Sequence, residues 1–217
     1  MPPFLKYDKR LRAAVLVSGG GSNLQALLNA QKSGLLKSAE ISLTVSSSAD
    51  AYALKRAAEA GVKTYVLQEE DYLNNGFFNK TGYSANLLSI LAKNQIQIVV
   101  LAGFLVILGE PLLSAYKNKI INVHPSLIPS FCGDGFYGLY VHEAALKKGV
   151  KITGATVHFV NDVTDGGEIL MQKAVDVKQG DTPETLQRRV MEEAEWVILP
   201  QALEALCASL ILQKKDL

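Results

Sequence analysis

The sequence predicts an α/β fold in which a mostly parallel, twisted sheet is flanked by helices and extended by antiparallel strands towards its C-terminal end. In the first hundred residues, strand-length apolar runs alternate with helical segments in a β-α-β-α-β-α-β order. The run from Ile96 to Leu101 is apolar without interruption, as in strands that are buried on both faces. Further on, a short turn separates two strand-like runs, which favours antiparallel pairing.

The alternating region contains four predicted strands and three predicted helices. The first helix begins at Ser22, which forms a predicted capping box with Gln25, and ends near Gly34. Residues 68–80 are polar and aromatic and are predicted to form a loop. The predicted strands are 11–17, 41–45, 62–67 and 96–101, and the other two helices are 49–60 and 83–93.

The second half continues the sheet and then becomes helical. Residues 127–138 are irregular and rich in glycine, and Pro200 is predicted to break the long helical region 182–212. No repeat or linker is evident, so we expect a single domain over residues 1–217, with residues 1–10 as a lead-in segment. The predicted elements are a short helix at 112–116, a strand at 120–124, a helix at 141–148, and antiparallel strands at 153–160 and 169–177.

Composition narrows the class of protein. The chain has 217 residues, of which 48% are hydrophobic, and a net charge of +1, so it can bury one full core and shows no basic patch for nucleic acid. The N-terminus lacks the apolar region of a signal peptide, and the apolar runs are too short to cross a membrane. We therefore expect a soluble cytoplasmic protein, as a monomer or homodimer. Cys132 and Cys207 are interpreted as structural, and the three histidines lack metal-binding spacing.

A glycine-rich turn, Ser18-Gly19-Gly20-Gly21-Ser22-Asn23, joins the first strand to the first helix. Leu24 stands where a dinucleotide fingerprint or a nucleophile elbow needs a small residue, and the Gly-Lys-Ser/Thr of a Walker A loop is absent. A single phosphate monoester could bind to the free N–H groups of such a helix N-terminus. On the loop alone, this reading and an ordinary strand-to-helix turn are equally well supported.

The strand 120–124 carries two candidate catalytic residues. Asn122 and His124 lie two positions apart and should therefore project from one face, at the carboxyl end where open α/β sheets bind ligands. Asp165 follows in a Gly-rich turn, where it could cap the turn or sit beside His124 and raise its pKa. An amide donor, an imidazole and a carboxylate suit oxyanion stabilisation and proton transfer. His158 and His142 are interpreted as structural, with a supporting role beside the site as the alternative for His158.

Four stretches of the chain are shared with one enzyme family: Ser18-Gly19-Gly20-Gly21-Ser22-Asn23-Leu24, Leu101-Ala102-Gly103-Phe104, Ile121-Asn122-Val123-His124-Pro125-Ser126-Leu127-Ile128-Pro129, and Val157-His158-Phe159-Val160 with Asp165-Gly166-Gly167. Over about residues 11 to 205 the chain thus resembles the phosphoribosylglycinamide formyltransferases. The resemblance implies the Rossmann-like formyltransferase fold. It also implies formyl transfer from 10-formyltetrahydrofolate to the amine of glycinamide ribonucleotide, by direct attack through a tetrahedral intermediate, in de novo purine biosynthesis. No metal is implied.

The resemblance also implies residue roles. Asn122, protonated His124 and Asp165 would be catalytic, with Asn122 also contacting folate, and the Ile128-Pro129 bond would be cis. Glu195 would contact glycinamide ribonucleotide, although one extra residue before it leaves Glu192 and Glu193 as alternatives. The substrate phosphate would be held by Gly21, Ser22 and Asn23, and folate by Lys80, Leu105, Val106, Ile107 and Leu108.

The chain departs from the family pattern at three places. The family often has arginine at position 80 and Met-Arg at 105–106, and the segment 133–138 is longer than in its shortest members. Two other functions remain open: a formyltransferase of this fold with another amine acceptor, and a non-catalytic module that binds folate or a phosphorylated metabolite. A turnover assay separates the enzyme from the binding module.

Overall fold

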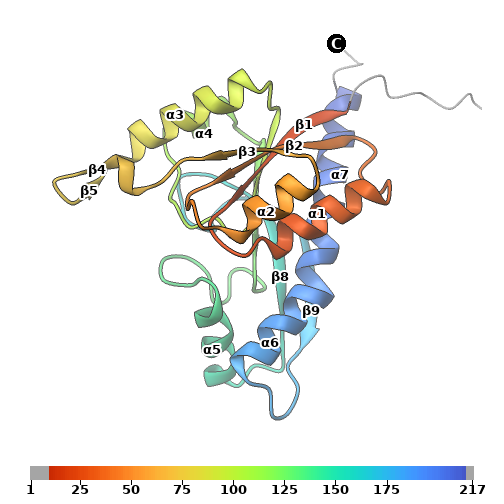
Figure 1. Cartoon of the computed structure of the whole chain (residues 1–217). Helices are drawn as coiled ribbons and strands as arrows, with labels where there is room; N and C mark the ends of the chain where they lie inside the picture. Colours follow the sequence, from red (N-terminus) through yellow and green to blue (C-terminus); the bar gives the residue numbers. More distant parts are fainter. Residues whose placement is uncertain (1–9, 214–217) are drawn as a thin grey trace, which may run out of the picture.

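A seven-stranded sheet runs through the computed structural model, which describes residues 10–213 (Figure 1). Its order is β3-β2-β1-β6-β7-β8-β9; neighbours from β3 to β7 are parallel, and β8 and β9 are added antiparallel. The predicted fold class is confirmed. The lead-in segment lies outside the described residues, apart from Arg10. The strands are β1 (Leu11–Val17), β2 (Ala39–Ser46), β3 (Lys63–Val66), β6 (Ile98–Leu101), β7 (Ile120–His124), β8 (Ile152–Phe159) and β9 (Ile169–Asp176).

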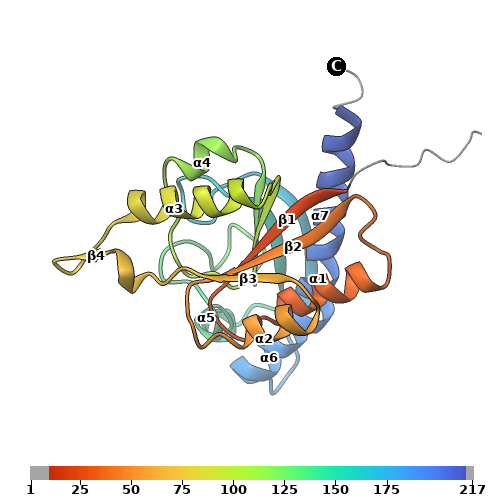
Figure 2. The same cartoon turned by 45° about the horizontal axis from the view of Figure 1, so that its top comes forward.

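Helices cover both faces of the sheet. Figures 1 and 2 show α1 and α7 together on one side, and α3 with α4 on the other. Helices α5 and α6 contact each other at the end of the molecule where β8 and β9 extend. The helices are α1 (Ser22–Lys32), α2 (Tyr52–Glu59), α3 (Lys80–Lys93), α4 (Leu112–Ala115), α5 (Leu139–Lys148), α6 (Pro183–Val190) and α7 (Trp196–Gln213).

Strand β1 belongs to two hydrophobic cores at once. Val15 and Val17 join the core that includes residues of α1 and α7, whereas Ala14 and Leu16 join the core that includes residues of α3 and α4. Successive side chains of a strand point to opposite faces, so both faces of β1 are buried. This explains why the central strands are apolar without alternation, and it fixes their carboxyl ends at one edge.

The predicted loop 68–80 contains a hairpin. A 3₁₀ turn, Glu70–Tyr72, leads into β4 (Leu73–Asn74) and β5 (Phe77–Phe78), which project from the body (Figure 1). The connecting Asn75 and Gly76 both have positive φ, 49° and 81°, as the tightest hairpin turns require. The sequence signal for this hairpin was Asn-Gly between apolar residues, and the predicted loop did not take it into account.

The predicted break at Pro200 is wrong. Pro200 is buried inside α7, and the helical region changes instead at a π-helical segment, Met191–Glu195. Pro200 lacks a backbone N–H and lies shortly after the point where π-helical hydrogen bonding gives way to α-helical bonding. A helix tolerates a missing hydrogen bond near such a local irregularity. The π segment turns Glu195 into the interior, where it is 6% exposed.

The continuous helical run Pro183–Gln213 is long and apolar enough to pass a length-and-hydropathy test for a membrane span. This was not expected from the sequence, in which the separate apolar runs are shorter. Half of the most apolar window is buried within the protein, and α7 contributes to the core that also contains residues of α1. These are the properties of a core helix.

His142 on α5 is fully buried, and within the described residues neither of its ring nitrogens has a hydrogen-bond partner. Burial lowers the pKa of His142 to about 4, with a smaller contribution from His124. The folded protein therefore holds this imidazole neutral, whereas the unfolded chain protonates it near pH 6.5.

We predict that His142 makes the fold sensitive to acid. Since the unfolded state binds the proton first, the free energy of unfolding should fall between about pH 6.5 and pH 4, by up to about 3 kcal/mol from this group. Urea denaturation of the wild type and His142→Leu across this range measures the effect. The variant should lose less stability than the wild type; identical pH dependence would contradict the prediction.

Candidate active site

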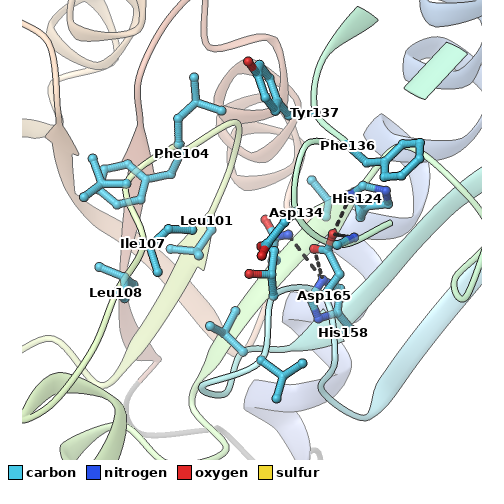
Figure 3. A pocket seen from close by; sticks show the side chains of 18 of the residues that line it. Leu101, Phe104, Ile107, Leu108, His124, Asp134, Phe136, Tyr137, His158 and Asp165 are labelled. Carbon is cyan, nitrogen blue, oxygen red and sulfur yellow. Dashed lines mark hydrogen bonds and ion pairs between the residues drawn. The ribbon is translucent and has the colours of Figure 1, made fainter. Parts of the chain in front are cut away.

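The candidate site is built around Asp165, whose buried carboxylate lies between two histidines (Figure 3). Its Oδ2 is 3.3 Å from His124 Nδ1 and its Oδ1 is 3.5 Å from His158 Nε2. His124 and Asn122 come from β7, and His158 comes from β8, where it pairs directly with Asn122. The structure thus brings Asn122, His124 and Asp165 together, as the sequence predicted.

A tight turn aims the Asp165 side chain inwards. Asp165 itself has a positive φ of 54°, which aspartate tolerates better than most residues. A Cβ on Gly167 would lie 1.7 Å from the Phe159 carbonyl oxygen, so no larger residue fits there. The Gly133 N–H then donates to Asp165 Oδ2 at 2.9 Å, which ties the segment 127–138 to the turn.

The net pKa shift of His124 differs from the prediction. Burial lowers the pKa of His124, and the Asp165 charge and the Phe131 carbonyl oppose this effect without cancelling it. Asp165 thus raises the pKa of His124 as predicted, but burial outweighs this effect, so the net pKa lies below its ordinary value. The sequence shows the carboxylate but not the 4% exposure of the imidazole. His124 Nε2 donates to the Phe131 carbonyl at 2.8 Å, and Nδ1 lies 3.3 Å from Asp165 Oδ2.

Asp165 remains ionised in its buried position. Burial raises the pKa of Asp165, but its contacts with His158 and His124 and the hydrogen bond from the Gly133 N–H lower it by more. The net pKa of Asp165 lies below its ordinary value. The cluster therefore combines a carboxylate, an imidazole N–H donor on His124 and the Asn122 amide, which can stabilise an oxyanion and accept a proton.

A cavity of about 540 Å³ opens beside this cluster. Asn122, His124 and Asp165 line it, as do the turn around Asp165, the segment 133–138 and the loop 103–108 (Figure 3). In that loop, Leu105 and Ile107 are exposed whereas Val106 and Leu108 are buried. All four predicted folate residues of the loop therefore reach the cavity.

Lys80 is not among the residues that line this cavity. Its methylene groups lie against Gly109, where an added Cβ would be 2.9 Å from Lys80 Cε. Position 80 is the first residue of α3, which Asn79 caps by accepting the Gly82 N–H. The structure therefore places Lys80 behind the loop 103–108 and gives no support to its predicted contact with folate.

The glycine loop has free backbone donors. Gly21, with φ of 72°, is the N-cap of α1 and has no side-chain cap, so the predicted Ser22–Gln25 capping box is wrong. The Gln25 amide is engaged elsewhere, because its Oε1 accepts from Arg56 and its Nε2 donates to Asn29. A Cβ on Gly21 would lie 2.6 Å from Ala53 Cβ, so only glycine fits. Uncapped N–H groups at a helix N-terminus favour an anion.

Glu195 is the acidic residue that reaches this loop. Asn23 Nδ2 donates to Glu195 Oε2 at 2.5 Å, and both side chains are buried. The two alternatives lie on the surface: Glu192 pairs with Arg188, and Glu193 is exposed. Burial raises the pKa of Glu195 to about 7, and the bond from Asn23 opposes this rise.

Several smaller expectations concern this region. The Ile128-Pro129 peptide bond is cis, as the resemblance implied. Both cysteines are free, and Cys132 donates to the Pro129 carbonyl. Within residues 10–213 no group of three or more metal-binding side chains is found. His158 was interpreted as structural, with a supporting role as the alternative; antiparallel pairing of 153–160 with 120–124 was the signal that could have placed it opposite Asn122.

The chain matches a known family and named relatives. The formyl transferase family matches residues 11–203. The trifunctional purine biosynthetic protein adenosine-3 of Homo sapiens is 40% identical over 203 residues, covering 94% of this chain and 19% of that protein. The chloroplastic phosphoribosylglycinamide formyltransferase of Vigna unguiculata is 34% identical over 208 residues, covering 96% and 64%. This chain therefore spans about a fifth of the human relative and under two thirds of the plant one.

A solved structure is similar over most of both chains. The crystal structure of glycinamide ribonucleotide transformylase 1 from Symbiobacterium toebii has a TM-score of 0.83 and 38% identity, covering 92% of this chain and 89% of that one.

We predict that Glu195 makes the fold less stable in alkali. Its folded pKa of about 7 lies above that of an unfolded glutamate, so stability is complete below about pH 4.3 and falls as the pH rises through 7. Glu195→Gln keeps an acceptor for Asn23 and cannot ionise. Thermal melts at pH 5 and pH 8 should show a smaller loss for this variant than for the wild type.

The matched control is Glu193→Gln, which changes an exposed residue of the same segment. It should follow the wild type at both pH values. If Glu195→Gln also follows the wild type, the buried carboxylate does not titrate as described.

Proposed function

The chain belongs to the formyl transferase family, and we propose that it transfers the formyl group of 10-formyltetrahydrofolate to the amine of glycinamide ribonucleotide, in purine biosynthesis. The observation that carries this proposal is the cluster of Asn122, His124 and Asp165 at the wall of a 540 Å³ cavity. The names of the relatives support the choice of acceptor, and the glycine loop supports an acceptor that carries a phosphate.

The chemistry begins with the amine. Its nitrogen attacks the formyl carbon, a C–N bond forms, and the carbonyl electron pair moves onto oxygen. Asn122 Nδ2 and His124 Nε2 are the donors proposed for this oxyanion. A neutral His124 suffices, because its Nε2–H is already a donor; it must leave the Phe131 carbonyl to reach the substrate.

Collapse of the intermediate breaks the bond between the formyl carbon and N10 of the folate. The amine loses one proton and N10 gains one, so the products are the formylated amine and tetrahydrofolate. Asp165 is ionised and therefore able to take the proton from the amine and make it available to N10, directly or through a water. No covalent enzyme intermediate is needed.

The two substrates have separate supports in this proposal. The loop 105–108 would hold folate, while the free N–H groups at Gly21, Ser22 and Asn23 would hold the 5′-phosphate. Glu195, held by Asn23, would contact the ribose or glycinamide part. Ser18 joins the two supports, since its hydroxyl accepts the Leu105 N–H at 3.0 Å.

The test is direct. Purified protein is mixed with 10-formyltetrahydrofolate and glycinamide ribonucleotide, and the release of tetrahydrofolate is followed. We expect product only when both substrates are present. Folded protein that binds either compound without turnover would instead identify a binding module. Turnover with a different amine and none with this one would identify another acceptor.

We predict that His124→Ala lowers the rate of formyl transfer by about 100- to 1,000-fold, the usual effect of removing one oxyanion donor. Initial rates at saturating substrates measure this, and circular dichroism shows whether the fold is kept. Near-normal turnover by the folded variant would exclude His124 from the chemistry.

A further inference from the structure

His158 is hydrogen-bonded in a way that fixes its tautomer. Its Nδ1 lies 2.8 Å from the carbonyl oxygen of Phe159, which can only accept, so Nδ1 carries a proton. Its Nε2 lies 3.2 Å from Asn122 Nδ2, which can only donate. With the Asn122 amide in this orientation, Nε2 accepts and presents a lone pair.

We propose that His158 is the positioning residue that orients the Asn122 amide for formyl transfer. The inference rests on the proposed function and extends it to a residue outside the predicted catalytic set. By accepting one Nδ2–H, the imidazole leaves the second N–H of Asn122 as the donor for the oxyanion. A flipped amide would place Asn122 Oδ1 against the Nε2 lone pair, and two acceptors repel each other.

Asn122 needs this partner because an amide is nearly symmetrical in shape. Its NH₂ and oxygen can exchange places at little steric cost, and an oxygen facing the oxyanion would oppose the reaction rather than assist it. The cross-strand pair places His158 directly opposite Asn122, and His158 is only 2% exposed. The ring therefore supplies a fixed acceptor that water does not easily replace.

The same ring has a second arrangement. When protonated, Nε2 donates instead of accepting, and Asp165 Oδ1 is 3.5 Å away to receive the bond. Asn122 then loses its acceptor and its orientation. The ionisable groups that face His158 are Asp165, from the turn after β8, and His124, on β7.

Two substitutions separate this role from simple packing. His158→Leu removes the acceptor, while His158→Gln restores an acceptor near the position of Nε2 that cannot be protonated. We expect His158→Leu to lower kcat by at least about tenfold with both KM values within about threefold, a partial loss of one oxyanion donor. His158→Gln should recover most of kcat.

Nuclear magnetic resonance of the wild type tests the hydrogen bond without turnover. At pH 7.5 the ¹⁵N signals of His158 should show one protonated and one unprotonated nitrogen. The side-chain amide of Asn122 should change in His158→Leu far more than in His142→Leu, a control that changes a buried histidine with no bond to Asn122.

The outcomes distinguish the two claims. Wild-type protein that makes no product would overturn the proposed function, while the nitrogen signals still decide the tautomer of His158. An active wild type with unchanged kcat in His158→Leu would overturn the positioning role. So would a doubly protonated His158 at pH 7.5. If His158→Leu does not fold, the wild-type signals and the kcat of His158→Gln decide.

Discussion

The site depends on a buried negative charge. Burying an isolated carboxylate is costly unless it is hydrogen-bonded and paired, and Asp165 meets this need with groups from three separate segments. Gly133 contributes an N–H from the segment 127–138, β7 contributes His124, and β8 contributes His158. The Asp165 charge therefore holds the site together, because His124 is a proposed catalytic residue and His158 is hydrogen-bonded to Asn122.

Sheet topology places the two halves of the site at one edge. Strands β1, β6 and β7 run parallel, so the glycine loop after β1, the loop 103–108 after β6 and the catalytic end of β7 share that edge. Ser18 ties the first two together through its bonds to Gly103 and Leu105. A substrate that reached from the glycine loop to Asp165 would thus lie across the carboxyl ends of the central strands.

Features set by one strand or one turn could be predicted from the sequence. The spacing of Asn122 and His124 gives their common face, and apolar runs give the central strands. Features set by tertiary packing could not. The pKa of His124 depends on how deeply the ring is buried, the missing cap at Ser22 depends on Arg56 engaging Gln25, and the helix change near Glu195 depends on the interior that Glu195 joins. The pairing of His158 with Asn122 could be predicted only in part, because it requires the correct register of two predicted strands.

The central claim is that the charge of Asp165 supports formyl transfer. Asp165→Asn tests it with little change of shape, because an asparagine oxygen can still accept the Gly133 N–H. The decisive measurement is the rate of tetrahydrofolate release by this variant from saturating 10-formyltetrahydrofolate and glycinamide ribonucleotide. We expect a fall of about 100-fold or more with the fold retained, of the size seen when a proton-transfer group is lost. A rate and pH profile equal to those of the wild type would contradict the account and reduce Asp165 to a structural residue of its turn.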